Sequence, residues 1–197
     1  MVSWVGGLLM QRSVNSFSRE VIAGKTYANT FNSFFISVFS AYATAAGIIT
    51  GQNAGKQNFT NIRGYNRRLL LMSLCWSAVI WIVNLCVPGT LLGLLAGDSV
   101  PVEIMEAGTW YLRSCSIGYP GLCILLICRS SLQSMGQYKI LPWLGIQEMM
   151  INTAMAFLAL YFGYQYVCLA NVLKWHLPGL VACVCYRKYL KMQEEKC

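Results

Sequence analysis

Three long apolar blocks, at residues 31–49, 69–95 and 141–164, constrain the fold of this chain more than any other feature. Each is close to or above the roughly 18–20 residues with which a helix crosses the hydrocarbon core of a bilayer. Lipid offers no hydrogen-bond partner to backbone N–H and C=O groups, so helices are the expected form. The sequence therefore predicts an all-α, polytopic membrane helix bundle.

The composition agrees with this interpretation, because 56% of the residues are hydrophobic and only 11% are charged, against about a quarter charged in soluble domains. The first apolar segment has sixteen residues and rises only about 24 Å as a helix, less than the core thickness of about 30 Å. We interpret it as a truncated helix and expect the chain to be part of something longer. We predict one domain, 1–197, with about six transmembrane helices at residues 1–16, 22–50, 68–95, 104–133, 139–162 and 164–190.

The net charge of +8 would suggest nucleic acid as the partner of a soluble protein. Here the basic residues cluster between apolar segments, at 56–68, at Lys139 and at 187–196, and no exposed aromatics alternate with them. This is the pattern of cytoplasmic loops in membrane proteins. It excludes a nucleic-acid partner, places both termini in the cytoplasm and puts Asp98, Glu103 and Glu106 outside. We expect a multi-pass protein of the cell (plasma) membrane.

The reactive side chains do not form a recognisable metal or catalytic motif. The chain has nine cysteines but no CxxC pair, and His176 is its single histidine. A zinc site of the usual ligand spacing is therefore not expected, and the cysteines are best interpreted as small apolar side chains of helices. No His, Asp or Cys cluster has catalytic spacing, so the sequence predicts no enzyme, no metal and no cofactor.

The stretch TGQNAGKQ at residues 50–57 resembles a phosphate-binding loop but differs from one in three ways. It has three spacers before Gly-Lys rather than four, Gln57 replaces the hydroxyl residue, and a membrane helix precedes it rather than a strand. The glycines instead continue a four-residue repeat of small residues, which is typical of closely packed membrane helices. We predict a helix-packing face made of Ala43, Gly47, Gly51 and Gly55.

Polar residues inside the spans are the candidate functional residues. Glu148 is an acid within a span, which by default suggests a proton or cation role, although near the cytoplasmic end it could instead snorkel or cap a helix. Asn29, Asn32 and Ser33 share a helix face, and Gln52 lies at the end of the same helix. This face could be the wall of a cleft for a cationic amphipathic substrate, or it could form interhelical hydrogen bonds.

Proline–glycine pairs interrupt two predicted spans, at Pro120-Gly121 and Pro178-Gly179. Proline removes a helical hydrogen bond and kinks the helix, so Pro120 and Pro178 are hinge candidates for a conformational change. A static bend is the alternative.

The order of several short motifs resembles a known family. These are Gly51-Gln52-Asn53 with Gly55-Lys56, Tyr111-Leu112-Arg113 with Pro120, Leu132-Gln133 with Gly136 and Pro142, Glu148, and Leu169-Ala170-Asn171 with Trp175. Together they resemble the C-terminal half of the multidrug and toxic compound extrusion (MATE) family. Asn152 stands where that family commonly has an arginine.

The resemblance implies one of two six-helix bundles that face each other across a cleft. It implies efflux of drugs, with amphipathic cationic small molecules as substrates and with Na⁺ or H⁺ as the coupling ion. The expected partners are the lipid bilayer and either a missing N-terminal half bundle or a second copy of the chain. The alternative function is a non-transporting fragment or membrane interaction module of a split transporter.

Overall fold

Helices account for nearly all of the chain. The computed structural model describes residues 2–97 and 100–195, with no strand among them; Asp98 and the end of the basic tail at Lys196 lie outside this part. The helices are α1 (Val2–Val14), α2 (Arg19–Gly55), α3 (Phe59–Cys86), α4 (Pro88–Ala96), α5 (Val102–Ser134), α6 (Ile140–Phe162) and α7 (Gln165–Glu194).

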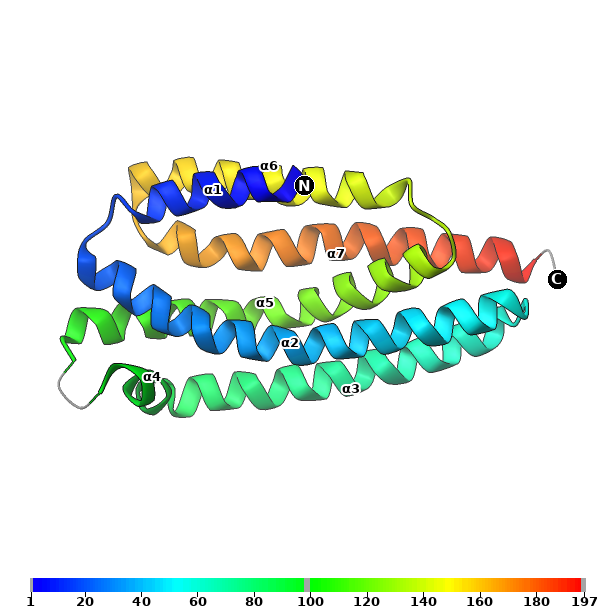
Figure 1. Cartoon of the computed structure of the whole chain (residues 1–197), viewed down its shortest axis with the longest axis horizontal. Coiled ribbons are helices and arrows are strands. Elements are labelled where there is room, and N and C mark those ends of the chain that lie inside the picture. The colour runs from blue at the N-terminus through cyan, green and yellow to red at the C-terminus, as the bar shows by residue number, and fades with distance from the viewer. Residues whose placement is uncertain (1, 98–99, 196–197) are drawn as a thin grey trace.

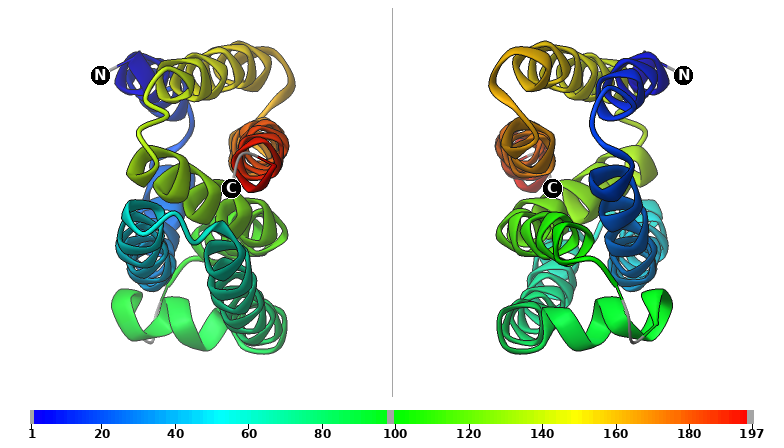
Figure 2. Two further views of the ribbon diagram at one scale, coloured as in Figure 1. Left: turned by 90° about the vertical axis from the view of Figure 1, so that its right-hand side faces the viewer. Right: turned by 90° about the vertical axis from the view of Figure 1, so that its left-hand side faces the viewer.

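The long helices lie side by side along one axis, with α1 beside α6 and α5 in the middle of the bundle (Figure 1). Five of them, α2, α3, α5, α6 and α7, are long and apolar enough to cross a membrane. The short helix α4 runs across one end of the bundle instead of along it (Figure 2). The prediction of an all-α membrane bundle is confirmed, with five full-length candidate spans and the short α1.

The helix boundaries differ from the predicted segments mainly around the third one. The predicted segment 68–95 is divided, because α3 ends at Cys86 and Pro88 begins α4. Proline fits the first turn of a helix but disfavours helical geometry in the residue before it. At its other end, α3 begins already at Phe59, where the Asn58 side chain caps it by accepting a hydrogen bond from the Asn61 amide at 3.2 Å. The basic segment 56–68 is therefore mostly helix rather than linker.

The two ends of the bundle differ in charge. The α2–α3 turn, the α5–α6 turn and the end of α7 lie together on the right of Figure 1, and this end carries Lys56, Lys139 and Arg187. We call it the inner end, following the charge rule for cytoplasmic loops, and the opposite end the outer end. Gly136 (φ 77°) and Gly163 (φ 104°) make the turns on either side of α6, in a backbone region that favours glycine.

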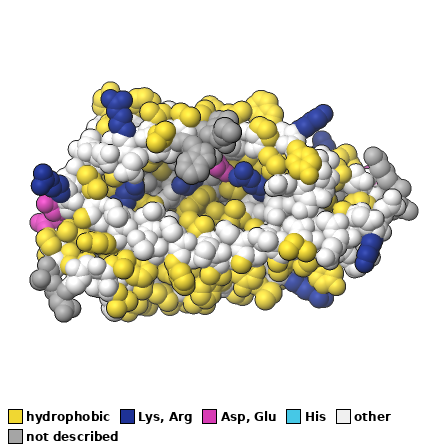
Figure 3. Space-filling view, viewed as in Figure 1, with side chains coloured by type: hydrophobic (Ala, Val, Ile, Leu, Met, Phe, Trp, Pro, Cys, Tyr) yellow, Lys and Arg dark blue, Asp and Glu magenta, His cyan; other side chains and the backbone are white. Residues whose placement is uncertain are grey.

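The core forms where α5 packs between α2 and α7. The Tyr119 ring of α5 is fully buried, stacks on Trp175 at 5.9 Å between centroids and lies 5.3 Å from Phe39. Many large apolar side chains instead point outward, among them Leu94 and Leu180. They form broad hydrophobic areas in the space-filling view (Figure 3), as expected for a surface in contact with lipid.

Candidate functional site

Two adjoining cavities, both open to the surface, lie between α1 and α6 on one side and α5 and α7 on the other. The larger measures roughly 360 Å³ and the smaller roughly 120 Å³. Gly7, Asn152 and Lys174 line both of them, so we treat the two as one interior cavity. Figure 3 shows acidic and basic side chains together at a hollow in this face.

Glu148 lies in this interior cavity on α6. Its Oε1 atom is 3.5 Å from Nη1 of Arg129 on α5, and the Glu148 side chain is only 18% exposed. The distance exceeds that of a good hydrogen bond, so the two groups compensate each other's charge without a tight directional contact. The charge pair joins α5 to α6 on the inner side of the cavity.

Two lysines complete the charge of the cavity. Lys174 of α7 is half-buried, and its ammonium lies 5.3 Å from the centre of the Trp175 ring. Lys25 of α2 donates a long hydrogen bond of 3.4 Å to Oε1 of Gln11. Neither lysine forms an ion pair with any described residue. Among the described residues that line the cavity, three cations, Arg129 included, therefore accompany one carboxylate.

The sequence did not single out Arg129, Lys174 or Lys25 as site residues. A signal was available, since a basic residue inside an apolar span is costly and usually faces a polar interior.

The polar face of α2 is divided between the protein interior and the surface. Asn32 is buried and accepts a hydrogen bond from the Tyr119 hydroxyl at 3.1 Å, while Asn29 accepts one from Tyr111 at 3.2 Å. The structure thus places both asparagines against α5. Ser33 and, near the inner end, Gln52 are exposed.

The repeat of small residues on α2 contacts α5 along part of its length. Ala43 and Gly47 are buried, and a methyl group on Gly47 would lie 2.5 Å from the Ser130 hydroxyl oxygen. Around Gly51 the space is looser, with the nearest atom at 3.8 Å, and around Gly55 it is open.

Pro120 and Pro178 lie within α5 and α7, where these helices cross. Here the glycines that follow the two prolines face each other, because a methyl group on Gly179 would lie 2.9 Å from the carbonyl oxygen of Gly121. The two proline–glycine pairs therefore form one crossing point between neighbouring helices.

A buried hydrogen-bond cluster, which the sequence gave no reason to expect, joins four helices near the inner end. Nδ2 of Asn66 on α3 lies 3.0 Å from the Thr50 hydroxyl, 2.9 Å from that of Ser131 and 2.9 Å from that of Tyr186. These partners belong to α2, α5 and α7, so one amide group, which can donate two hydrogen bonds at a time, contacts all three other helices.

Comparisons with known proteins agree on the family and the fold. The MatE family profile matches residues 1–164, whereas no protein of curated function matches the sequence. Among solved structures, a MOP-superfamily transporter from Pyrococcus furiosus Vc1, described as having a binding pocket of reversed polarity that suggests a different function, superposes with a TM-score of 0.83 at 15% identity. A MATE protein in complex with MaL6 gives 0.84 at 15% identity, and an outward-facing multidrug resistance MATE transporter gives 0.82 at 16%.

These similarities extend over 98% of this chain but over only 43–44% of each of the three solved chains. The chain therefore spans less than half the length of the transporters that it resembles.

Proposed function

Since this chain belongs to the MatE family, we propose that it is one half of a cation-coupled antiporter that exports drugs and other xenobiotics. The observation that carries the proposal is the interior cavity, in which the Glu148–Arg129 pair lies beside Lys174 within a bundle of candidate membrane spans. Charged groups within membrane spans are costly and mark substrate, ion or proton pathways. Amphipathic cationic molecules are the proposed substrates, in a cleft between this bundle and a second one.

We propose H⁺ rather than Na⁺ as the coupling ion, and Glu148 as its carrier. Hard cations prefer several oxygen ligands with negative charge. Within the described lining, Glu148 is the one carboxylate and it shares the cavity with Arg129, Lys25 and Lys174. Such a positive surrounding repels Na⁺, whereas a proton can move on and off the carboxylate.

Protonation of Glu148 would remove its attraction to Arg129 and so weaken the charge contact between α5 and α6. In this proposal the bundle relaxes about the α5–α7 crossing at Pro120 and Pro178, which act as hinges. Deprotonation on the other side of the membrane restores the pair. Proton binding thus biases the equilibrium between inward-open and outward-open states.

The test uses everted membrane vesicles that contain this chain together with a six-helix N-terminal half bundle, or this chain as two linked copies. With an imposed pH gradient, we expect a cationic dye to release protons from the vesicles. Glu148→Gln should abolish this exchange and Glu148→Asp should retain part of it. Dye exchange driven by a Na⁺ gradient alone, or unchanged in Glu148→Gln, would refute the assignment of the proton carrier.

The second candidate function, a non-transporting fragment or interaction module, rests on the coverage of less than half of each solved transporter. In that case the inserted chain should co-purify with other membrane helices, and no arrangement of two bundles should lower dye accumulation in cells. Reduced accumulation with either arrangement favours the transporter.

We also propose that the protein lies in the plasma membrane with both termini in the cytoplasm. Alkaline phosphatase, which is active only outside the cytoplasm, should be active when fused after Gly163 and inactive when fused after Gly136. The reverse result would invert the orientation.

A further inference from the structure

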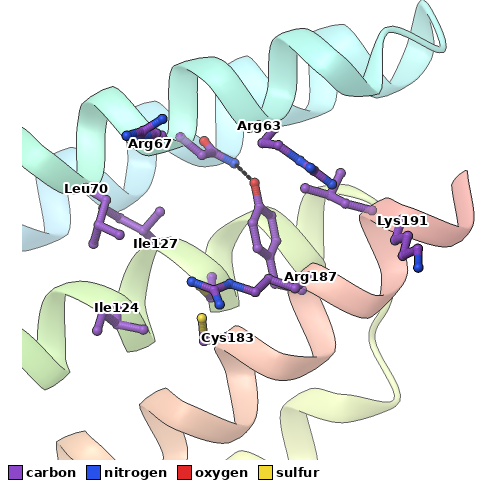
Figure 4. Close-up of a pocket in the computed structure, with 12 residues that line it drawn as sticks. Arg63, Arg67, Leu70, Ile124, Ile127, Cys183, Arg187 and Lys191 are labelled. Carbon is purple, nitrogen blue, oxygen red and sulfur yellow. Dashed lines mark hydrogen bonds between the residues drawn. The ribbon is translucent and has the colours of Figure 1, made fainter. Parts of the chain in front are cut away.

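A second cavity, of roughly 500 Å³, opens between α3, α5 and α7 near the inner end, away from the interior cavity. Its rim carries four cations, which are Arg63 and Arg67 of α3 and Arg187 and Lys191 of α7. Figure 4 shows these two pairs on facing helices, on either side of the same space. We call this cavity the inner crevice.

Two of the four cations on the rim have an acidic partner and two have none. Arg63 pairs with Glu194 at 2.7 Å, and Lys191 has only a distant, exposed partner in Glu195 at 3.8 Å. Arg67 and Arg187 form no ion pair with any residue in the described part of the chain. Loops with positive charge are normal at a cytoplasmic surface, so this charge alone does not define a site.

The polarity gradient along the walls is what distinguishes the crevice from an ordinary basic surface. On α3 the lining changes from Arg63 to Leu70, seven residues or about 10 Å toward the middle of the helix. On α5 the wall is formed by Ile124, Ile127 and Cys128, and Figure 4 shows the two isoleucines farther along the helices than Arg63 and Lys191. The crevice is therefore cationic at its mouth and apolar along its depth.

We propose that the inner crevice binds an anionic phospholipid of the inner leaflet, such as phosphatidylglycerol. Its phosphate would contact Arg67 and Arg187, and one acyl chain would lie along Leu70 and Ile124. Basic pockets between membrane helices on the cytoplasmic side bind anionic lipid headgroups in this way, and guanidinium groups match phosphate geometry. The lipid bridges α3 to α7, which otherwise meet here through the Asn66–Tyr186 hydrogen bond and the Arg63–Glu194 ion pair.

The experiment is native mass spectrometry of the full chain in micelles that contain phosphatidylglycerol or phosphatidylcholine. We expect bound phosphatidylglycerol in excess over phosphatidylcholine. The variant Arg67→Gln/Arg187→Gln should weaken phosphatidylglycerol binding roughly tenfold to thirtyfold, since each cation beside an anionic headgroup contributes roughly a fivefold factor in affinity. The matched control is Arg68→Gln/Lys188→Gln, which removes the same charge from the neighbouring exposed positions that do not line the crevice.

A second variant tests the acyl-chain wall and separates lipid from free phosphate. Ile124 is half-buried in the apolar wall, so Ile124→Trp should occupy the space of the acyl chain and weaken phosphatidylglycerol binding. Excess inorganic phosphate should not displace the lipid. Equal losses in the two charge variants would show only general surface attraction. Equal binding of phosphatidylglycerol and phosphatidylcholine would also overturn the proposal. So would displacement of the lipid by phosphate together with unchanged phosphatidylglycerol binding in Ile124→Trp. Gel filtration checks folding, and the exposed arginine pair decides the result if the tryptophan variant aggregates.

Discussion

Gly179 of α7 and Gly121 of α5 meet backbone to backbone, such that a methyl group on Gly179 would lie 2.9 Å from the carbonyl oxygen of Gly121. A methyl group on Gly121 would in turn lie 2.8 Å from the His176 ring. The absence of a side chain at both positions lets α5 and α7 cross closely. Each glycine follows a proline that interrupts its helix, so the contact and the bends occur at one level of the bundle.

Gly179→Ala should therefore destabilise the protein, because the added methyl group has no flexible neighbour to displace. Overpacking of this kind costs about 1–3 kcal/mol, and it outweighs the gain in helix propensity of about 1 kcal/mol from glycine to alanine. We expect a lower midpoint of thermal unfolding in detergent, measured by loss of the monodisperse gel-filtration peak.

The matched control for this substitution is Gly145→Ala in α6. Gly145 is also a helical glycine of an apolar span, but a methyl group there would meet no atom within 4 Å. This variant should keep or raise the midpoint. If both variants behave alike, the α5–α7 crossing does not depend on the glycine contact.

Tyr119→Phe should show whether the polar face of α2 holds the bundle together. The substitution removes the hydrogen bond to Asn32 and leaves the buried amide oxygen without that donor. Interhelical hydrogen bonds in membranes contribute about 0.6 kcal/mol on average and up to about 1.7 kcal/mol. We expect a loss of stability in this range in denaturant titration, while Ser33→Ala at the exposed position of the same face should change nothing. Loss of stability in Ser33→Ala alone would contradict this assignment.

Asn66→Leu should cause a larger loss, because the amide nitrogen lies within 3.0 Å of hydroxyl groups on three other helices and can donate its two hydrogens to two of them at a time. Leucine has a similar volume but leaves the buried hydroxyls of Thr50 and Ser131 with fewer partners, which costs about 1–3 kcal/mol. The additional variant Tyr186→Phe should add little once Asn66 is replaced, and a double-mutant cycle measures this coupling. Additive effects would mean that the Asn66–Tyr186 bond does not contribute to stability.

The sequence predicts the fold class well because the bilayer imposes long, apolar, hydrogen-bonded helices, and it predicts the family because motif order survives where identity is low. It does not predict which way each helix faces. The buried side of α5 extends around much of the helix, as the burial of Tyr111, Leu112 and Ser114 illustrates, so no stripe of residues reveals its neighbours. The Asn32–Tyr119 bond and the Glu148–Arg129 pair each join side chains of different helices. They depend on those orientations and become visible only in the structure.

The charge balance of the interior cavity leads to the last prediction. Glu148→Gln leaves Arg129 and Lys174 without a carboxylate in the cavity, whereas Lys174→Met leaves the Glu148–Arg129 pair neutral. Breaking a buried pair costs about 3–5 kcal/mol when a charge remains uncompensated, and replacing charge by apolar volume is often neutral. Because the Arg129 side chain is 39% exposed, we expect a smaller loss, of about 1–2 kcal/mol, for Glu148→Gln.

Lys174→Met should be neutral or stabilising, and Glu148→Gln/Lys174→Met should recover part of the loss. Thermal unfolding of the three variants measures the order. The contrary result is a lower unfolding midpoint for Lys174→Met than for Glu148→Gln. It would show that the lysine charge stabilises the protein by compensating a group other than the described residues that line the cavity.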